Sequence, residues 1–243
     1  MTLPVFLVEA LPSGEDFLLD GPEGRHAATV KRLRVGEELV LSDGSGTQVR
    51  CSVVAVDRDA LSLRVLERWA EPEPAPRVVL AQALVKGDRG ELAVELATEA
   101  GVDGVVPWRA ARCVAKWEDG PRGAKALGRW RSTVREAAKQ ARRARVPFVD
   151  EPVSTTQLAQ RVSSSALTLV LHESATDRLA DVEFPAAGDV LLVVGPEGGI
   201  SPEELDVLRS SGARIVRLGP TVLRASTAAA VALGAIGVLT SRW

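Results

Sequence analysis

Hydrophobic and polar positions follow one pattern in the first 70 residues of the chain and another after them. In the first part, short runs rich in valine and leucine alternate with turn residues. The runs at residues 38–42 and 48–54 flank an Asp-Gly turn, which is a common connection in hairpins, and residues 61–66 alternate in the same way. With a helical segment expected at residues 26–33, this part predicts a small β-barrel or sheet domain.

A proline-rich segment separates the two patterns. Residues 71–76 read Glu-Pro-Glu-Pro-Ala-Pro, a composition that continues neither a strand nor a helix and forms a stiff linker. We therefore expect a first domain at residues 1–70, a linker at residues 71–76 and a second domain at residues 77–243.

In the second domain, runs typical of buried strands alternate with runs typical of helices. The predicted strands occupy residues 78–84, 102–107, 167–172, 189–195 and 214–218. The predicted helices occupy residues 89–100, 127–145 and 225–241, and Ser201 with Glu204 forms a capping box for one more. This alternation predicts an α/β fold with a parallel sheet that helices cover on both faces.

Three of the predicted strand ends carry candidate chemistry. Residues 195–205 form a glycine-rich turn into a helix, residues 217–228 form a second turn with Ser226 or Thr227 as the helix cap, and His172 follows a third buried run. Ligands gather at the carboxyl ends of parallel strands, where glycine lets backbone N–H groups approach them. The same glycines also suit a tight connection that binds nothing. The first turn lacks the lysine and hydroxyl of a phosphate loop, so nucleotide phosphate binding is disfavoured.

The size and composition of the chain indicate a globular protein without disulfides or a metal centre. It has 243 residues, of which 46% are hydrophobic and 26% charged, and its two cysteines, Cys51 and Cys113, lack neighbours that could complete a metal site. His172 also has no evident metal partner. The N-terminus lacks the basic flank of a secretory signal, and no apolar run reaches the length of a membrane span, so the cytoplasm is the expected compartment.

The net charge of -2, taken over the whole chain, argues against a polyanionic partner. The distribution of charge along the chain changes this interpretation. Residues 109–145 hold twelve Lys or Arg and three acidic residues, which gives +9 there and -11 elsewhere. A solvated helix face mixes both signs, so this segment favours contact with a nucleic acid. The first domain adds a smaller basic cluster at residues 25–34. Two basic patches on two domains predict a clamp on an RNA or DNA backbone, with an affinity that falls with salt.

Several ordered motifs are similar to those of one protein family. The pair GPEGG at residues 195–199 and LGPTVLR at residues 218–224 resembles the cofactor-binding region of the SPOUT methyltransferases, and specifically the RsmE family of 16S ribosomal RNA uridine-N3 methyltransferases. His26, Arg32 and Arg34 resemble the PUA-like N-terminal domain of that family. Further matches follow in the family's order: KGDR at 86–89, RCV at 112–114, EAAKQ at 136–140 and RARVP at 143–147.

The resemblance implies a fold, a cofactor and partners. The fold is α/β, with a small N-terminal PUA-like β-barrel domain and a C-terminal SPOUT domain whose strands and loops tie a deep trefoil knot, an exception to the rule that chains do not thread loops. The cofactor is S-adenosyl-L-methionine, and the substrate is 16S rRNA within the small ribosomal subunit. Such enzymes act as homodimers with the pocket near the subunit interface, without a metal or a membrane.

Site residues follow from the motifs and from the basic patches. The residues expected to bind the cofactor come from three strand ends and the loops after them: Leu171, His172, Glu173, Val194, Gly195, Pro196, Glu197, Gly198, Leu218, Gly219, Pro220, Val222, Leu223, Arg224 and Thr227. The residues expected to bind RNA come from both domains: Arg25, His26, Lys31, Arg32, Arg34, Lys86, Arg112, Lys116, Arg135, Lys139, Arg142, Arg143 and Arg145. Where the family often reads Leu-Arg-Thr-Glu-Thr-Ala, this chain reads Leu-Arg-Ala-Ser-Thr-Ala at residues 223–228, so no catalytic acid or base is assigned to Ser226.

Methyl transfer to N3 of uridine makes two demands on side chains. N3 is neutral and weakly acidic, so the reaction gains from a group that accepts its proton and from a group that stabilises the anion spread over the flanking carbonyl oxygens. Arginine suits the second role because it is always charged and donates several directed hydrogen bonds. We expect Arg143 or Arg224, together with Arg112, to approach the base or its phosphate. Glu197 is the carboxylate expected to act as a base or to face the cofactor.

Other functions are compatible with the same residues. A non-catalytic RNA-binding or ribosome-assembly factor keeps the basic clamp but needs no S-adenosylmethionine. A SPOUT enzyme that methylates a ribose 2′-hydroxyl or transfer RNA yields a different product nucleoside. A small-molecule methyltransferase leaves the +9 segment without an explanation.

Overall fold

A computed structural model describes residues 3–243; residues 1 and 2, with which the predicted first domain begins, lie outside the described residues. The chain divides into two compact units. The first unit runs to Glu73 and also includes Ala138–Val146, whereas the second comprises Pro74–Ala137 and Pro147–Trp243. The second unit therefore begins inside the proline-rich segment, and the first takes in a segment from far along the chain.

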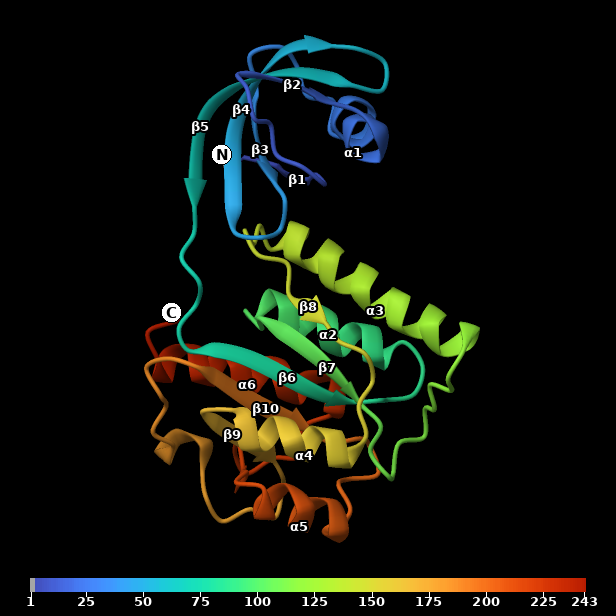
Figure 1. Cartoon of the computed structure of the whole chain (residues 1–243), viewed down its shortest axis with the longest axis vertical. Helices are drawn as coiled ribbons and strands as arrows, with labels where there is room; N and C mark the ends of the chain where they lie inside the picture. Colours follow the sequence, from blue (N-terminus) through green and yellow to red (C-terminus); the bar gives the residue numbers. More distant parts are fainter. Residues whose placement is uncertain (1–2) are drawn as a thin grey trace. The chain divides into compact units, whose positions relative to one another are not determined.

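The first unit is built on a curled five-stranded sheet in the order β1-β3-β4-β5-β2 (Figure 1). Its strands are β1 (Val5–Leu7), β2 (Asp16–Leu19), β3 (Glu38–Ser42), β4 (Thr47–Val56) and β5 (Leu61–Ala70). The predicted hairpin is confirmed as β3 and β4, and two irregularities in the β4–β5 pairing bend the sheet. The core consists of inward-facing residues such as Leu39, Leu41, Val49, Leu61 and Leu63. The predicted β-barrel is thus observed as a curled half-barrel.

Between β2 and β3 the chain forms α1 (Gly21–Arg25) and one turn of π-helix, η1 (His26–Val30). The helical segment predicted at residues 26–33 therefore overlaps the observed one but begins five residues too late. It also extends three residues too far, because Arg32 adopts a left-handed backbone with φ of 55°. His26 packs edge-on against Phe6, with ring centroids 6.0 Å apart.

The segment Ala138–Val146 completes the first unit by binding the turn between β3 and β4. The N–H of Gly46 donates to the carbonyl oxygen of Ala144 at 3.0 Å, and the N–H of Val146 donates to the carbonyl oxygen of Gly44 at 2.9 Å. This segment follows α3 (Pro121–Gln140), where Arg142 adopts φ of 56°. A left-handed residue just past a helix ends it. The helix predicted at residues 127–145 is therefore wrong at both ends.

The second unit contains a six-stranded, fully parallel sheet in the order β11-β9-β10-β6-β7-β8. Its strands are β6 (Arg77–Ala83), β7 (Gly104–Trp108), β8 (Phe148–Val149), β9 (Leu167–Leu171), β10 (Asp189–Val194) and β11 (Arg214–Val216). The central strands β6 and β10 are mostly apolar and are buried beyond their first residues, because a parallel sheet is buried on both faces.

Helices cover this sheet on both faces, as predicted (Figure 1). On one face, α4 (Thr155–Ser164) and α5 (Pro202–Ser210) pack through Leu158 and Leu208 onto sheet residues such as Val79 and Leu191. On the other face, α2 (Arg89–Glu99) packs against α6 (Ala225–Leu239). A short 3-10 turn, η2 (Leu179–Asp181), lies between β9 and β10 along the chain.

Some elements were not predicted from the sequence. Strands β1, β2 and β8 have only two to four residues each, too few for a hydrophobic period to be recognised. Helix α4 was also missed, although Ser154 and Gln157 form a capping box at its start that could have indicated it. Between residues 3 and 243, no helix has both the length and the apolar character needed to cross a bilayer.

Candidate functional site

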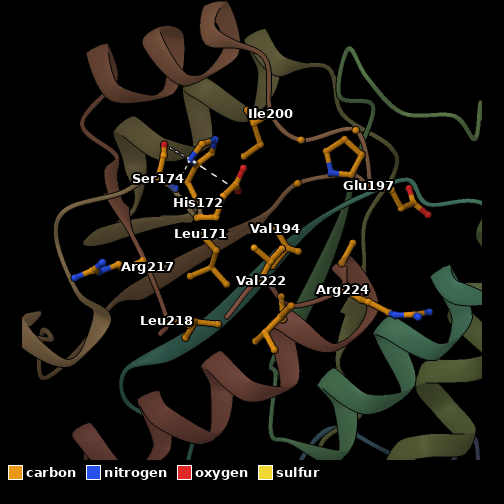
Figure 2. A pocket seen from close by; sticks show the side chains of 18 of the residues that line it. Leu171, His172, Ser174, Val194, Glu197, Ile200, Arg217, Leu218, Val222 and Arg224 are labelled. Atoms are coloured by element: carbon orange, nitrogen blue, oxygen red, sulfur yellow. Dashed lines mark hydrogen bonds and ion pairs between the residues drawn. The ribbon is translucent and has the colours of Figure 1, made fainter. Parts of the chain in front are cut away.

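The carboxyl ends of β9, β10 and β11 and the loops that follow them enclose a cavity of about 850 Å³ (Figure 2). These strands are neighbours or near neighbours in the parallel sheet, so their carboxyl ends lie at the same edge. The cavity lies at the edge where ligands bind in open α/β sheets, and its size is within the range of small-molecule sites. We call it the first cavity.

The centre of the first cavity is apolar. Leu171 from the end of β9, Val194 from the end of β10 and Val222 from the loop after β11 converge there (Figure 2). Arg217 lies at one side of this group, and Glu197 and Arg224 lie at the other (Figure 2). An apolar centre with a few polar groups around it is typical of sites for small organic ligands.

The glycine-rich turn after β10 forms one wall of the first cavity. The N–H of Gly199 donates to the carbonyl oxygen of Pro196 at 2.9 Å, and Gly199 has φ of +74°, which favours glycine. A Cβ atom on Gly195 would lie 2.6 Å from Cγ1 of Ile200, and one on Gly198 would lie 3.1 Å from Cβ of Arg112. The glycines are therefore required both by the dihedral angles of the turn and by close packing behind the cavity.

His172 is held in place by its neighbours. Its backbone N–H donates to the carbonyl oxygen of Val216 at 2.9 Å, which joins the ends of β9 and β11. Its Nδ1 atom accepts the N–H of Ser174 at 3.3 Å and lies 2.8 Å from the Ser174 hydroxyl oxygen. No group of three or more His, Cys, Asp or Glu side chains suited to a metal ion occurs within residues 3–243. His172 therefore serves as a lining residue with a fixed ring orientation.

Charged groups from three loops meet at the glycine wall. The Glu197 carboxylate accepts the backbone N–H of Lys86 at 3.3 Å, and Nη1 of Arg112 donates to the carbonyl oxygen of Gly198 at 3.3 Å. Arg224 precedes α6 and lines the same cavity. Glu197, Arg112 and Arg224 are thus three of the charged residues that line the first cavity.

Glu204 is a buried carboxylate just behind this wall. Its Oε1 atom accepts hydrogen bonds from the N–H of Ala111 at 2.9 Å and the hydroxyl of Thr155 at 2.8 Å. Its Oε2 atom accepts the N–H of Ser201 at 3.2 Å, which completes the predicted capping box of α5. The sequence pattern predicted the capping box, but the hydrogen bonds to Ala111 and Thr155 could be recognised only in the structure.

Most of the residues predicted to bind a cofactor line the first cavity. The exceptions are Pro220 and Thr227, and Thr227 instead donates its hydroxyl to the carbonyl oxygen of Arg224 at 3.2 Å. Arg112, predicted to bind RNA, also lines the cavity. The lining residues that were not predicted as site residues include Ser174, outside the recognised motifs, and five residues inside them: Arg89, Ile200, Leu205, Arg217 and Thr221. Their signal was weak, since each looks like an ordinary loop or helix residue.

The residues predicted to bind RNA belong to both units. Those in the first unit are Arg25, His26, Lys31, Arg32, Arg34, Lys139, Arg142, Arg143 and Arg145, and those in the second are Lys86, Arg112, Lys116 and Arg135. Segments 25–34 and 139–145, which are far apart in sequence, are thus brought into one unit. Arg143, a predicted catalytic residue, belongs to the first unit and is not among the residues that line the first cavity.

Among these basic side chains, Arg25 pairs with Asp59 at 3.3 Å, and two others, Lys139 and Arg145, also bind partners within the first unit. Nζ of Lys139 donates to both carboxylate oxygens of Glu23, at 2.7 and 2.8 Å, and lies 5.7 Å from the ring centre of Phe6. The Arg145 guanidinium donates to the carbonyl oxygens of Ser45 and Glu71. Both residues hold Ala138–Val146 in place, which leaves the exposed residues Lys31, Arg32, Arg34 and Arg142 as the basic surface of this unit.

Neither cysteine is a reactive thiol. Burial raises the pKa of Cys113 to about 11, although its hydrogen bonds to the backbone of Ala110 and Leu84 act in the opposite direction. Burial also raises the pKa of Cys51 to about 11. Both thiols are therefore protonated at neutral pH, and neither provides a nucleophile.

Comparison with known proteins shows clear similarities over both parts of the chain. Residues 71–237 match an RNA methyltransferase domain, and residues 19–66 match an RNA methyltransferase PUA domain. Ribosomal RNA small subunit methyltransferase E of Mycobacterium tuberculosis is 57% identical over 248 aligned positions, which cover 100% of this chain and 94% of that protein. The protein of the same name from Bacillus subtilis is 32% identical, with 92% of this chain and 90% of that protein covered.

Solved structures show the same arrangement of elements. A ribosomal RNA small subunit methyltransferase E from Neisseria gonorrhoeae, bound to S-adenosyl methionine, superposes with a TM-score of 0.85 at 26% identity and covers 98% of each chain. A methyltransferase from Legionella pneumophila, in complex with the cofactor SAM, superposes with a TM-score of 0.83 at 30% identity and covers 98% of this chain and 97% of that one.

Proposed function

Because this chain belongs to the ribosomal RNA small subunit methyltransferase E family, we propose that it transfers a methyl group from S-adenosyl-L-methionine to N3 of a uridine in 16S rRNA of the small ribosomal subunit. The observation that supports this most is the first cavity, which most of the residues expected to bind the cofactor line. The relatives with bound S-adenosylmethionine share the fold over nearly the whole chain.

The residues of the first cavity fit the proposed cofactor. S-adenosylmethionine combines a flat adenine ring with hydroxyl, amino and carboxylate groups. Leu171, Val194 and Val222 offer an apolar surface for the ring. A Cβ atom on Gly219 would meet nothing within 4 Å, so this part of the wall is open to a ligand. Backbone groups at the strand ends and the polar side chains around the centre are available to the remaining groups.

When bound, the cofactor supplies an electrophilic methyl group, and the side chains must prepare the acceptor. Glu197 holds a carboxylate at the cavity wall, where it accepts the proton of N3. The guanidinium of Arg224 stabilises the negative charge that develops on the uracil carbonyl oxygens. The apolar centre excludes water and strengthens both interactions.

The domain that we propose at residues 1–70 belongs to the first unit, and this unit serves to hold RNA. Residues 71–76 form the linker, and residues 77–243 serve as the methyltransferase domain. The exposed residues Lys31, Arg32, Arg34 and Arg142 support this role because none of them makes an ion pair within residues 3–243, so their charges are available to phosphates. We assign Arg143 to the RNA as well. The Lys31-to-Arg34 cluster contacts backbone phosphates, so affinity falls steeply with salt.

The proposal includes a homodimer, a knotted second domain and a cytoplasmic location. Val231 and Val238 on α6 are 49% and 75% exposed, an apolar face that suits a second copy of the chain. The knot is proposed on the match of residues 71–237 to an RNA methyltransferase domain. The cytoplasm follows from the ribosomal substrate.

Labelled-methyl transfer to 30S subunits, followed by digestion and mass analysis of the nucleosides, tests the proposed function. We expect 3-methyluridine as the product. A 2′-O-methylated nucleoside, or transfer to transfer RNA alone, would identify a different enzyme of the same fold. Calorimetry that detects no binding of S-adenosylmethionine would instead indicate an RNA-binding factor.

The role of Arg143 is tested separately. In an Arg143→Ala variant we expect methylation of 30S subunits to fall while the affinity for S-adenosylmethionine stays at the wild-type value. Unchanged turnover would remove Arg143 from the mechanism.

A further inference from the structure

A second cavity, of about 840 Å³, adjoins the first and shares two residues with it, Arg89 and Glu197. It lies over the turn from β6 into α2, and its other walls include Lys86, Leu92 and Glu95. We propose that this second cavity holds the nucleobase that accepts the methyl group. The inference rests on the proposed function, and it assigns an acceptor site that meets the first cavity at Arg89 and Glu197.

The position of the two shared residues supports this assignment. A methyl donor and its acceptor must meet at a common boundary, and Arg89 and Glu197 are the residues that line both cavities. The N–H of Lys86 donates to Glu197 at 3.3 Å and so ties this carboxylate to the turn that carries Arg89. The boundary is therefore built from two loops that hold each other.

The start of α2 is fixed by packing, which gives Arg89 a defined place. A Cβ atom on Gly90 would lie 3.0 Å from Nε1 of Trp130, a residue only 2% exposed, so the helix approaches this indole as closely as a glycine permits. The next residue, Glu91, accepts a hydrogen bond from Arg129 at 2.8 Å. The first turn of α2 is thus anchored to α3 by two independent contacts.

The chemistry of the boundary matches the Watson–Crick edge of uracil. That edge presents an acceptor, a donor and an acceptor: a carbonyl oxygen, N3–H and a second carbonyl oxygen. Glu197 is an acceptor and suits N3–H, whereas the guanidinium of Arg89 is a donor and suits a flanking oxygen. Within residues 3–243 neither Lys86 nor Arg89 makes an ion pair, so both keep donors for the ligand. Cytosine presents an unprotonated N3, which the carboxylate repels.

The remaining walls suit a neutral ring rather than a phosphate. Leu92 is 41% exposed and offers an apolar surface to a base. The carboxylates of Asp88 and Glu95 also line the cavity, and they disfavour a bound phosphate group. The basic surface that takes up the RNA backbone is therefore separate from the cavity that takes up the base. Since N3 is inaccessible in a base pair, the uridine enters unpaired or pulled from its stack.

Substitutions that fill the second cavity alone test the proposal. Leu92→Trp and Glu95→Trp both place a large ring in the second cavity, and neither residue lines the first. We expect both variants to bind S-adenosylmethionine within about twofold of wild type and to lose about tenfold or more in methyl transfer to 30S subunits. Glu99→Trp adds the same ring to an exposed position of α2 outside both cavities, and it should match wild type in both measurements.

A binding experiment without the cofactor gives a second measurement. Two short single-stranded RNAs that differ in one uridine or cytidine are compared for affinity. Wild type should prefer the uridine RNA, and both Glu197→Gln and Arg89→Ala should reduce that preference severalfold. If Leu92→Trp fails to fold, the methyl transfer by Glu95→Trp and the ratio of the affinities for the two RNAs still test the acceptor cavity.

The possible failures are distinguishable. Full turnover of the filled variants alongside an active wild type, or an unchanged base preference in Glu197→Gln, would overturn the acceptor cavity and leave the proposed function intact. A wild-type protein that binds S-adenosylmethionine but transfers no methyl group to 30S subunits would contradict the proposed function itself.

Discussion

The carboxylate of Glu204 accepts the backbone N–H of Ala111 at 2.9 Å, so the side chain that caps α5 also holds the loop that carries Arg112. Arg112 in turn contacts Gly198 in the wall of the first cavity. Glu204 is only 6% exposed, and it satisfies three donors from separate segments. A residue that looks like an ordinary helix cap thus connects the α5 start to the site.

We predict that Glu204→Ala destabilises the protein by about 1–3 kcal/mol, because the substitution leaves buried donors without an acceptor. Glu204→Gln, which keeps one carbonyl oxygen, should cost less. Urea unfolding measures the loss, and calorimetry should show weaker binding of S-adenosylmethionine in the alanine variant. Equal midpoints for wild type and Glu204→Ala would refute this account.

Adding one methyl group to the glycine wall should disturb the first cavity. In Gly195→Ala the new Cβ would lie 2.6 Å from Cγ1 of Ile200, so the turn must shift, and we expect the affinity for S-adenosylmethionine to fall about tenfold. Ile200→Ala removes the atom that clashes. If steric contact is the cause, the double variant should bind more tightly than Gly195→Ala alone.

The bond between Lys139 and Glu23 should contribute to stability in the first unit. The side chains are 12% and 24% exposed, so the exposure of this ion pair is intermediate between that of a surface pair and that of a buried pair. Removing either partner should therefore lower the free energy of unfolding by about 2 kcal/mol. A double-mutant cycle with Lys139→Ala and Glu23→Ala isolates the interaction. A coupling free energy near zero would show that the pair does not hold the segment.

Two arginines adopt a backbone that favours glycine, Arg32 with φ of 55° and Arg142 with φ of 56°. Replacing each by glycine relieves this strain, so the free energy of unfolding should stay the same or rise by about 1 kcal/mol, while affinity for rRNA falls and depends less on salt. Arg34→Gly is the matched control, because it loses the same charge at a position without positive φ and should lower stability. Chemical denaturation and filter binding provide the two measurements.

The cysteines give a pH dependence with a definite sign. Burial raises the pKa of Cys51 from 9.0 to about 11, so the folded state favours the protonated thiol. Its contribution to stability is full below pH 9 and is lost as the pH rises toward 11. At pH 8, iodoacetamide should react with the native protein about a hundredfold more slowly than with the unfolded chain. Equal rates would show that the thiols are accessible and ionised in the native state.

The sequence predicted those parts of the fold that depend on local periodicity. The buried runs of β6 and β10, the β3–β4 hairpin and the capping box of α5 were all found in this way. The end of α3 was not, because a left-handed Arg142 and bonds to a distant hairpin terminate the helix there. Such contacts join residues about 100 positions apart, and no local pattern records them.

The site was predicted less completely than the fold. Motifs placed most of the first cavity at the strand ends, yet Arg89 and Arg217 were not named as site residues although both lie in those motifs, since an arginine at a helix start or a strand end is common. The sequence signal at Lys139 was misleading. Its charge matched a basic stripe, but the carboxylate that binds it lies in α1, more than a hundred residues earlier. A count of charges along the sequence treats such residues as available to RNA, although in the folded chain they already bind a carboxylate.

The first unit is not complete when its first 73 residues have been made. In the hairpin turn, the N–H of Gly46 and the carbonyl oxygen of Gly44 bond to residues 144 and 146, and the carboxylate of Glu23 binds Lys139. On the ribosome, therefore, the sheet that appears first must wait for about half of the remaining chain before its contacts can form. A fragment cut at the proline-rich linker would lack these partners, so exchanging this unit between relatives requires two segments to be transplanted together.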